Sequence, residues 1–358
     1  MVSFGGWDMP VEYPATGGIV AEHLAVRTAV GVFDVSHMGD ILIESAGHPG
    51  SALAAVQHIS MNDAAQLAIG QAQYSALLYP EGTFVDDVLV HRTGGEEYML
   101  VINAGTREKD FQWVRSNTSS FTCSVRDRGD DFTQLAIQGP HAAELLQKLT
   151  DANLSRIKNY RFTWGTVCGL PQVMIARTGY TGEDGFEIYI PSDVSTSEMV
   201  WNRILDPGKP LGILPCGLGA RNTLRLEAKM ALYGHEISDK INVWEAGLER
   251  YCKLEKGDFI GRAALERARA AGVRRVLAGL EMLDRGIARD DYKVFDDAGR
   301  EIGYVTSGSP SPFLKKNIAL AYVPPECAAI GQIVLVEVRG QKLKAQIVPT
   351  PFYKRPKR

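Results

Sequence analysis

Residues 84–90 (FVDDVLV) place two adjacent carboxylates, Asp86 and Asp87, in an otherwise apolar segment. Because successive side chains of a strand point to opposite faces, we expect Asp86 to share a face with Phe84 and Val88. Asp87 then points to the other face, so the two carboxylates are not expected to act as a dyad. An unpaired charge among apolar neighbours is costly. Each carboxylate is therefore either paired within the protein or kept for work on a ligand.

The glycine-rich segment 177–187 (RTGYTGEDGFE) is a second candidate. Its glycines allow tight turns and a close approach of the backbone to a ligand. The strand that follows places Glu187 on the face opposite Phe186 and Ile188. A carboxylate held on rigid structure can accept two parallel N–H bonds, which suits the edge of a guanidine-like ring. The alternative is a plain glycine-rich hairpin without a ligand.

Two arginines form a third candidate. Residues 217–222 (GLGARN) begin like a dinucleotide-binding loop but lack its third glycine, so we interpret them as the start of a helix at 217–229. On that helix Arg221 and Arg225 lie one turn apart. Like charges on one face favour a shared anion, which is either a carboxylate of the protein itself or a carboxylate of a ligand.

Two polar segments near the C-terminus carry less information. Residues 305–317 (VTSGSPSPFLKKN) are expected to form a long polar turn at the surface. The basic residues 354–358 are expected to be a solvated terminus.

The elements that must position these residues follow from hydrophobic periodicity and turn residues. Helices are expected at 16–29, 51–57, 63–68, 105–116, 140–149, 196–205, 217–229 and 259–271. Strands are expected at 40–44, 74–79, 84–90, 98–102, 172–177 and 186–190. From about residue 275, short β-rich segments (276–282, 291–295, 301–306, 317–323, 332–338 and 342–348) alternate with Gly, Pro and Asp turns, which predicts a β barrel or sandwich. The chain is therefore predicted to be α+β with an all-β C-terminal domain.

Composition excludes several classes of protein. The 358 residues are enough for two or three domains. The 39 Lys and Arg residues against 42 Asp and Glu residues give a net charge of −3, so no nucleic-acid partner is expected. No apolar run has the length of a membrane span, and the first residues do not read as a signal peptide. The five cysteines are widely spaced, which favours a reducing compartment such as the cytoplasm over a disulfide scaffold.

Common catalytic motifs are missing from the sequence. It contains no P-loop, no GxSxG, no HExxH and no CxxC pair, and its seven histidines do not cluster at metal-ligand spacing. No metal site is therefore predicted.

Several segments together resemble the glycine cleavage T-protein family of tetrahydrofolate-dependent aminomethyltransferases. The matching segments occur in the family's order along nearly the whole chain: residues 4–10, 33–38, 74–78, 85–90, 103–110, 178–187, 217–221, 224–228, 258–261, 306–308 and 311–312. The resemblance implies transfer of the methylene of an aminomethyl group from lipoylated H-protein to tetrahydrofolate, with release of ammonia. The expected product is 5,10-methylenetetrahydrofolate, and the expected enzyme is a monomer that meets its carrier transiently.

The resemblance also implies roles for individual residues. Asp86 corresponds to the catalytic carboxylate near the folate N5 nitrogen, and Glu187 to the carboxylate that pairs with the pterin edge. The other positions expected to bind the folate are Tyr180, Arg221, Asn103, Arg289 and Tyr353. In a eukaryote the family would place the protein in the mitochondrial matrix.

The fold implied by the resemblance is a three-domain cloverleaf with a C-terminal β barrel. Its first domain is expected at 1–50 plus about 130–235, interleaved with a second at about 51–129 plus about 236–273. The third domain is expected at about 274–358.

Three positions depart from the family pattern. Arg250 stands where the family usually has a Trp that lines the folate site, Asn222 where Asp is usual, and Lys229 where Gly is usual. The family's usual stretch before residues 4–7 (FGGW) is also missing.

The alternatives to an aminomethyltransferase are a folate-dependent demethylase that uses another methyl or methylene donor, and a non-catalytic folate-binding protein.

Overall fold

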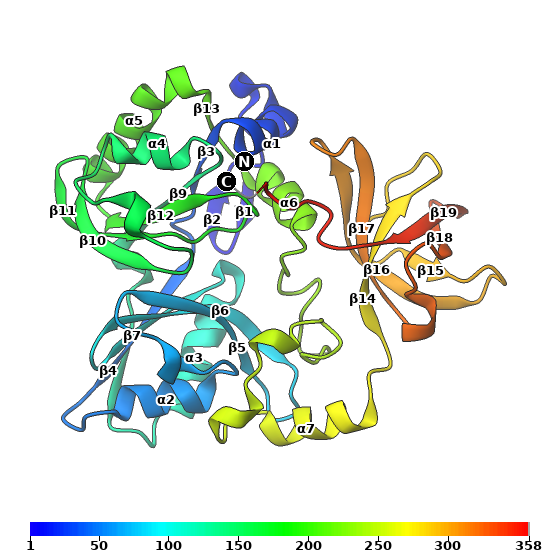
Figure 1. The fold of residues 1–358 in the computed structure, drawn as a ribbon, viewed down its shortest axis with the longest axis horizontal. Helices are drawn as coiled ribbons and strands as arrows, with labels where there is room; N and C mark the ends of the chain where they lie inside the picture. Colours follow the sequence, from blue (N-terminus) through cyan, green and yellow to red (C-terminus); the bar gives the residue numbers. More distant parts are fainter. Residues whose placement is uncertain (357–358) are drawn as a thin grey trace.

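The computed structural model describes residues 1–356 and contains three domains arranged around α6 and the segment that follows it (Figure 1). A six-stranded sheet forms the first domain, a five-stranded sheet the second, and a closed barrel the third. The predicted α+β cloverleaf with a C-terminal barrel is confirmed. Lys357 and Arg358, at the end of the basic terminus, lie outside the described residues.

The first sheet has the strand order β10-β11-β12-β9-β3-β13. Its strands are β3 (Val30–Asp34), β9 (Phe132–Gln138), β10 (Phe162–Val167), β11 (Leu170–Ala176), β12 (Gly185–Pro191) and β13 (Ile213–Pro215). Two helices pack on one face, α4 (Ala142–Gln147) and α5 (Val194–Gly208). The apolar residues of α1 (Gly18–Thr28) and α6 (Leu218–Glu227) form a separate core on the other face.

The second sheet has the order β5-β6-β7-β4-β8. Its strands are β4 (Gly39–Ser45), β5 (Gln71–Leu78), β6 (Phe84–Gly94), β7 (Glu97–Ile102) and β8 (Cys123–Asp127). Helices α2 (Ser51–Ile59) and α3 (Arg107–Asn117) cover one face. The segment 237–265, which includes the start of α7 (Arg262–Ala271), packs on the Phe84 end.

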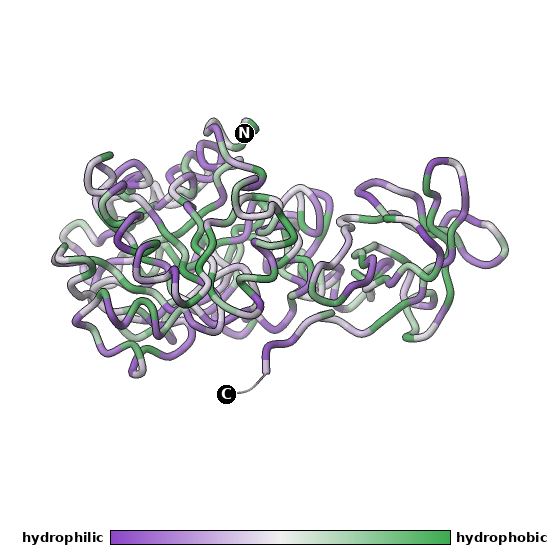
Figure 2. Tube along the Cα trace, turned by 90° about the horizontal axis from the view of Figure 1, so that it is seen from above, coloured by the Kyte–Doolittle hydropathy of each residue, from purple (hydrophilic) through white to green (hydrophobic). Residues whose placement is uncertain are grey.

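The barrel closes in the order β14-β17-β16-β15-β18-β19. Its strands are β14 (Val276–Met282), β15 (Lys293–Phe295), β16 (Glu301–Ser311), β17 (Lys316–Val323), β18 (Ile333–Val338) and β19 (Gln341–Val348). Seen from above, it stands beside the other two domains, and the last residues leave it and run back toward them (Figure 2).

The chain crosses from the first sheet to the second within residues 1–50, the range predicted for the start of the first domain. Strand β4 pairs with β7 and β8 of the second sheet. The chain therefore changes sheets between Asp34 and Gly39. The strand itself was predicted from its apolar residues, but the identity of its partners depends on contacts far away in the sequence.

The prediction of a surface turn at 305–317 is wrong. Strand β16 continues to Ser311, and Ser307 and Ser311 are buried. Their hydroxyls bond to buried charged groups of α6: Arg225 donates to Ser307 at 2.8 Å, and Ser311 donates to Glu227. Because their hydroxyls are hydrogen-bonded to these charged groups, the serines of this polar strand can be buried inside the protein.

The first residues form a small hairpin, β1 (Val2–Phe4) and β2 (Trp7–Met9), that was not predicted. Its turn lies directly against η3 (Ala104–Thr106): a Cβ on Gly5 would lie 2.8 Å from the Cβ of Ala104. The positive φ of Gly5, 58°, also favours glycine here. The hairpin thereby reaches the segment that carries Asn103.

Candidate functional site

Asp86 lies at a β-bulge near the start of β6. Asp86 pairs with Leu77, but Phe84 pairs with the adjacent Leu78, so the extra residue of the bulge is Val85. Val85 consequently packs in the same core as Val88, whereas Phe84 packs in a different one. A bulge bends the strand and turns its side chains, so simple alternation fails at this point.

The carboxylate of Asp86 is completely buried and accepts several hydrogen bonds. Its Oδ1 accepts from the backbone N–H of Asp87 and from Nδ2 of Asn103, both at 2.9 Å. Its Oδ2 accepts from the hydroxyl of Thr106. Three neutral donors therefore fix the orientation of Asp86 without cancelling its negative charge.

Asp87 lies close enough to Asp86 to interact with it strongly. The same Nδ2 of Asn103 donates to Oδ1 of Asp87 at 2.9 Å. Burial and the charge of Asp86 raise the pKa of Asp87 to about 7. The prediction that the two carboxylates are separated on opposite faces is therefore wrong, because the bulge and Asn103 bring them together.

An aromatic pair extends from Asp87 toward the surface. The hydroxyl of Tyr74 donates to Oδ2 of Asp87 at 3.0 Å, and its ring packs on Tyr251 with 4.7 Å between centroids. The guanidinium of Arg250 lies 4.3 Å from the centre of the Tyr251 ring. Arg250, at the position where the resemblance implies a Trp, is exposed and places a cation on the adjacent aromatic ring.

Glu187 lies in β12, between β11 and β9. Phe186 and Ile188 pack in the core under α4 and α5, while Tyr189 packs in the core between the two sheets. Because Glu187 alternates with Phe186 and Ile188, it faces the second domain. Burial raises the pKa of Glu187, and the hydrogen bond that Thr178 donates to its Oε2 and the charge of Arg221 oppose this rise.

The glycine-rich turn before β12 requires glycine for space and for conformation. A Cβ on Gly179 would lie 2.1 Å from Oε1 of Gln138. Gly182 has a φ of +79°, and a Cβ there would lie 2.7 Å from Ala228. These contacts hold the turn close to β9 and to the end of α6, and so fix the position of the adjacent Tyr180.

The two arginines of α6 have different environments. Arg225 is buried, forms a 2.7 Å ion pair with Glu236 and matches the expected internal pairing. Within residues 1–356, no ion pair includes Arg221. Its guanidinium lies 4.9 Å from the centre of the Tyr180 ring. Arg221 is thus the cation of the pair that remains available to an anionic or aromatic ligand.

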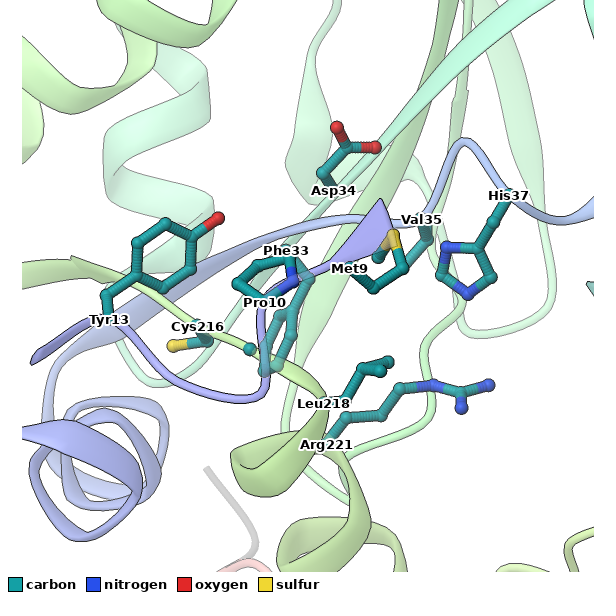
Figure 3. Close-up of a pocket in the computed structure, with 11 residues that line it drawn as sticks. Met9, Pro10, Tyr13, Phe33, Asp34, Val35, His37, Cys216, Leu218 and Arg221 are labelled. Carbon is teal, nitrogen blue, oxygen red and sulfur yellow. The ribbon is translucent and has the colours of Figure 1, made fainter. Parts of the chain in front are cut away.

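The side chain of Arg221 extends from α6 past Leu218 toward His37 (Figure 3). Burial and, to a smaller extent, the charge of Arg221 lower the pKa of His37 to about 3. His37 is therefore neutral near physiological pH, so it does not repel the positive charge of Arg221. Its ring packs edge-on against Phe4 of the N-terminal hairpin, with centroids 5.4 Å apart.

Electrostatic interactions connect the two halves of the site. Burial lowers the pKa of Arg221, and the charges of Asp87 and Glu187 partly offset this effect. Burial raises the pKa of Tyr180, whose hydroxyl donates to the carbonyl of Ala231. The structure thus gathers Asp86, Asn103, Tyr180, Glu187 and Arg221 from the first two domains into one region.

Arg289 and Tyr353 have other contacts. Arg289 is exposed, in the loop between β14 and β15, and its guanidinium donates to the carbonyl of Gly308 at 3.5 Å. Tyr353 lies under the guanidinium of Arg27 at 4.0 Å, and its backbone N–H donates to Glu227. Among the described residues, no hydrogen bond or ion pair joins Arg289 or Tyr353 to the residues gathered around Asp86.

Sequence reasoning missed Thr106, Tyr74 and His37 as parts of the site. All three lie in segments that carried the family resemblance, but nothing in their spacing indicated contacts with Asp86, Asp87 or Arg221.

In the described part of the chain, no group of three or more His, Cys, Asp or Glu residues could hold a metal ion. No helix in residues 1–356 combines the length and apolar character needed to cross a membrane.

Comparisons with known proteins agree with this geometry. Residues 1–256 match the family described as the GCVT N-terminal domain, and residues 275–354 match the glycine cleavage T-protein C-terminal barrel domain. The chain belongs to the glycine cleavage T-protein family. An aminomethyltransferase of Acidobacterium capsulatum is 66% identical over all of this chain and 93% of its own length, and one of Koribacter versatilis is 64% identical over the same shares.

A solved structure supports the same assignment. The glycine cleavage system aminomethyltransferase T of Bartonella henselae has a TM-score of 0.90 and 33% identity, covering 99% of this chain and 94% of that one. As a glycine cleavage T-protein, the chain is an aminomethyltransferase with tetrahydrofolate as co-substrate. These matches do not favour a demethylase or a non-catalytic folate-binding protein.

Proposed function

We propose that the residues gathered around Asp86 bind tetrahydrofolate and receive the aminomethyl group from lipoylated H-protein. The observation that carries this proposal is a set of three charged side chains that differ in which of their atoms already form hydrogen bonds or ion pairs within the protein. Asp86 is buried and oriented by neutral donors. Within residues 1–356, Glu187 keeps one oxygen without a hydrogen bond and Arg221 has no ion pair. This set provides an acceptor and a cation for binding, and a fixed negative charge for the reaction.

Glu187 is assigned to the pterin ring. Thr178 occupies its Oε2, so Oε1 and the remaining lone pairs of the carboxylate are available. The edge of the pterin presents neighbouring N–H groups in a guanidine-like pattern, and a carboxylate accepts two such bonds in parallel. Tyr180 and Arg221 stack with each other beside this carboxylate, which suits them to hold the ring.

Asp86 is assigned to the reacting end of the folate. In the reaction the aminomethyl carbon loses its bonds to the lipoyl sulfur and to the amino nitrogen, and it forms bonds to the N5 and N10 nitrogens. The two protons released from N5 and N10 end on the sulfur and on the amine, so the carrier returns to its dithiol form and ammonia leaves. Cleavage develops positive charge on the transferred carbon, and the buried carboxylate of Asp86 stabilises this charge more than it could in water.

Orientation of the two reactants makes the other large contribution. Holding both in a reactive arrangement can lower a barrier by roughly 7–11 kcal/mol at most. Asn103 contributes to orientation by donating to both Asp86 and Asp87 from a single Nδ2 atom. H-protein is proposed as a transient partner, because each turnover must release the carrier before the next one binds.

The test is to mix the protein with tetrahydrofolate and aminomethylated H-protein and to measure ammonia and 5,10-methylenetetrahydrofolate together. Equal amounts of both products that depend on the protein support the proposal. The matched control replaces the carrier with sarcosine or dimethylglycine as methyl donor and measures 5-methyltetrahydrofolate, because a methyl group transferred without an oxidant stays at the methyl oxidation level. Formation of 5-methyltetrahydrofolate from these donors, with no product from H-protein, would overturn the proposed donor and favour a demethylase.

A further inference from the structure

A third carboxylate, Asp110, has no part in the function described so far. It lies close to Asp86, because the Nζ of Lys109 contacts both Asp110 and the carbonyl of Val85, the residue before Asp86. It belongs to the first turn of α3 and is completely buried. Neither of its oxygens accepts a hydrogen bond from a donor group of the described residues. An isolated buried carboxylate without donors would carry a large desolvation cost if it were ionised.

The nearest cation is already engaged. The Nζ of Lys109 forms a 3.4 Å ion pair with Oδ1 of Asp110, but it donates its hydrogen bond to the carbonyl of Val85. The same Nζ lies 4.2 Å from the centre of the Tyr233 ring. Lys109 therefore gives Asp110 only part of the compensation that an ionised carboxylate needs.

The neighbouring carboxylate offers a different form of compensation. Two ionised carboxylates are both acceptors and cannot hydrogen-bond to each other, whereas a protonated one becomes a donor. Burial and the neighbouring Asp86 carboxylate together raise the pKa of Asp110 to about 10, although the charge of Lys109 and the hydroxyl of Thr106 oppose the rise. The other titratable groups that face Asp110 are Lys109 on its own helix and the phenols of Tyr233 and Tyr79.

We propose that Asp110 is a positioning residue that holds a proton near neutral pH and donates it in a hydrogen bond to Asp86. This inference rests on the catalytic role proposed for Asp86. A Lys or Arg in the same place would also orient Asp86, but its charge would cancel the negative charge that stabilises the developing cation. A neutral acid supplies a donor and leaves that charge intact, as Asn103 and Thr106 also do.

The test compares three variants in the full-length protein. Asp110→Ala removes the donor, and Asp110→Asn keeps the shape and offers an N–H donor that cannot ionise. Glu108→Gln is the matched control, because Glu108 lies in the same helical turn but is exposed and bonds to Gln112. Infrared difference spectra between wild type and Asp110→Asn, recorded near neutral pH, report the carbonyl band of an un-ionised carboxylic acid without any need for activity.

We expect Asp110→Ala to lower kcat at least about tenfold with less than about a twofold change in folate Kd, and Asp110→Asn to restore most of the rate. We also expect the band of one carboxylic acid to be missing from Asp110→Asn and kept in Glu108→Gln. If the difference spectrum lacks that band, Asp110 is ionised and the proposal is wrong, whether or not the protein transfers aminomethyl groups. Equal rate losses in the Asn and Ala variants would likewise overturn it. An inactive wild type that shows the band would count against the proposed function alone.

Discussion

The substitution Glu187→Gln tests the assignment of the pterin site. Glu187 is held in β12 between two strands, and its Oε2 accepts from Thr178. Glutamine has the same shape but replaces one acceptor oxygen with a donor NH₂ group. One bond from the ligand is then lost and the other is no longer charge-assisted, while the packing around the side chain is preserved.

The size of the effect follows from these bonds. A hydrogen bond to a charged group contributes about 1.5–3 kcal/mol, against about 0.5–1.5 kcal/mol for a neutral one. Losing one charged bond and weakening a second gives roughly 2–4 kcal/mol, which corresponds to a roughly 30- to 700-fold increase in folate Kd. Because burial already raises the pKa of Glu187, removing its charge is not expected to lower the Tm.

The assay is a titration of tetrahydrofolate by calorimetry, followed by single-turnover transfer at saturating folate. We expect the large change in Kd and a change in the saturated rate below about threefold, because the carboxylate binds the ring end and does not touch the reacting carbon. Glu198→Gln, on the exposed face of α5, is the control and should leave the Kd unaltered. A Kd for Glu187→Gln within twofold of wild type would refute the assignment.

Three further predictions concern stability and the rim of the site. Glu236→Gln removes the negative charge that lies 2.7 Å from the buried guanidinium of Arg225 and leaves that cation uncompensated, so we expect a loss of about 3–5 kcal/mol in the free energy of unfolding by denaturant titration; a loss below about 1 kcal/mol contradicts the pairing. Burial raises the pKa of Asp40 from 3.8 to about 8, so its contribution to stability is complete below pH 3.8 and is lost as the pH rises toward about 8. The Tm of Asp40→Asn should therefore fall less than that of wild type between about pH 5 and 9, and equal slopes would speak against this shift. Arg250→Ala removes an exposed cation stacked on Tyr251, so folate Kd should rise by less than about fivefold by calorimetry; a rise above about a hundredfold would make Arg250 a principal contact.

The elements with clear periodicity could be predicted from the sequence. Helices such as α2 and α6 and the strands of the barrel follow their apolar spacing. Strand β9 could not be predicted in this way, because Thr133, Gln134 and Gln138 are buried along with its apolar residues. When both faces of a strand are covered, polar residues no longer mark the solvent side.

The site was harder to predict than the fold. Alternation placed Glu187 correctly, because β12 is regular, but it failed at Asp86, because a single extra residue shifts the register of β6. The pairing of Arg225 with Glu236 and of Asp86 with Thr106 depends on segments that meet only in the folded chain. Residue types indicated which groups could react, and tertiary contacts decided which of them remain available.

The most direct test of the central claim is the single-turnover rate of Asp86→Asn with aminomethylated H-protein and saturating tetrahydrofolate. Asparagine keeps the size of the side chain and removes the buried negative charge. We predict a rate about 10²- to 10³-fold below wild type, with folate Kd within about threefold and an unchanged circular dichroism spectrum. A correctly folded Asp86→Asn protein that transfers the aminomethyl group at the wild-type rate would contradict the catalytic role assigned to Asp86.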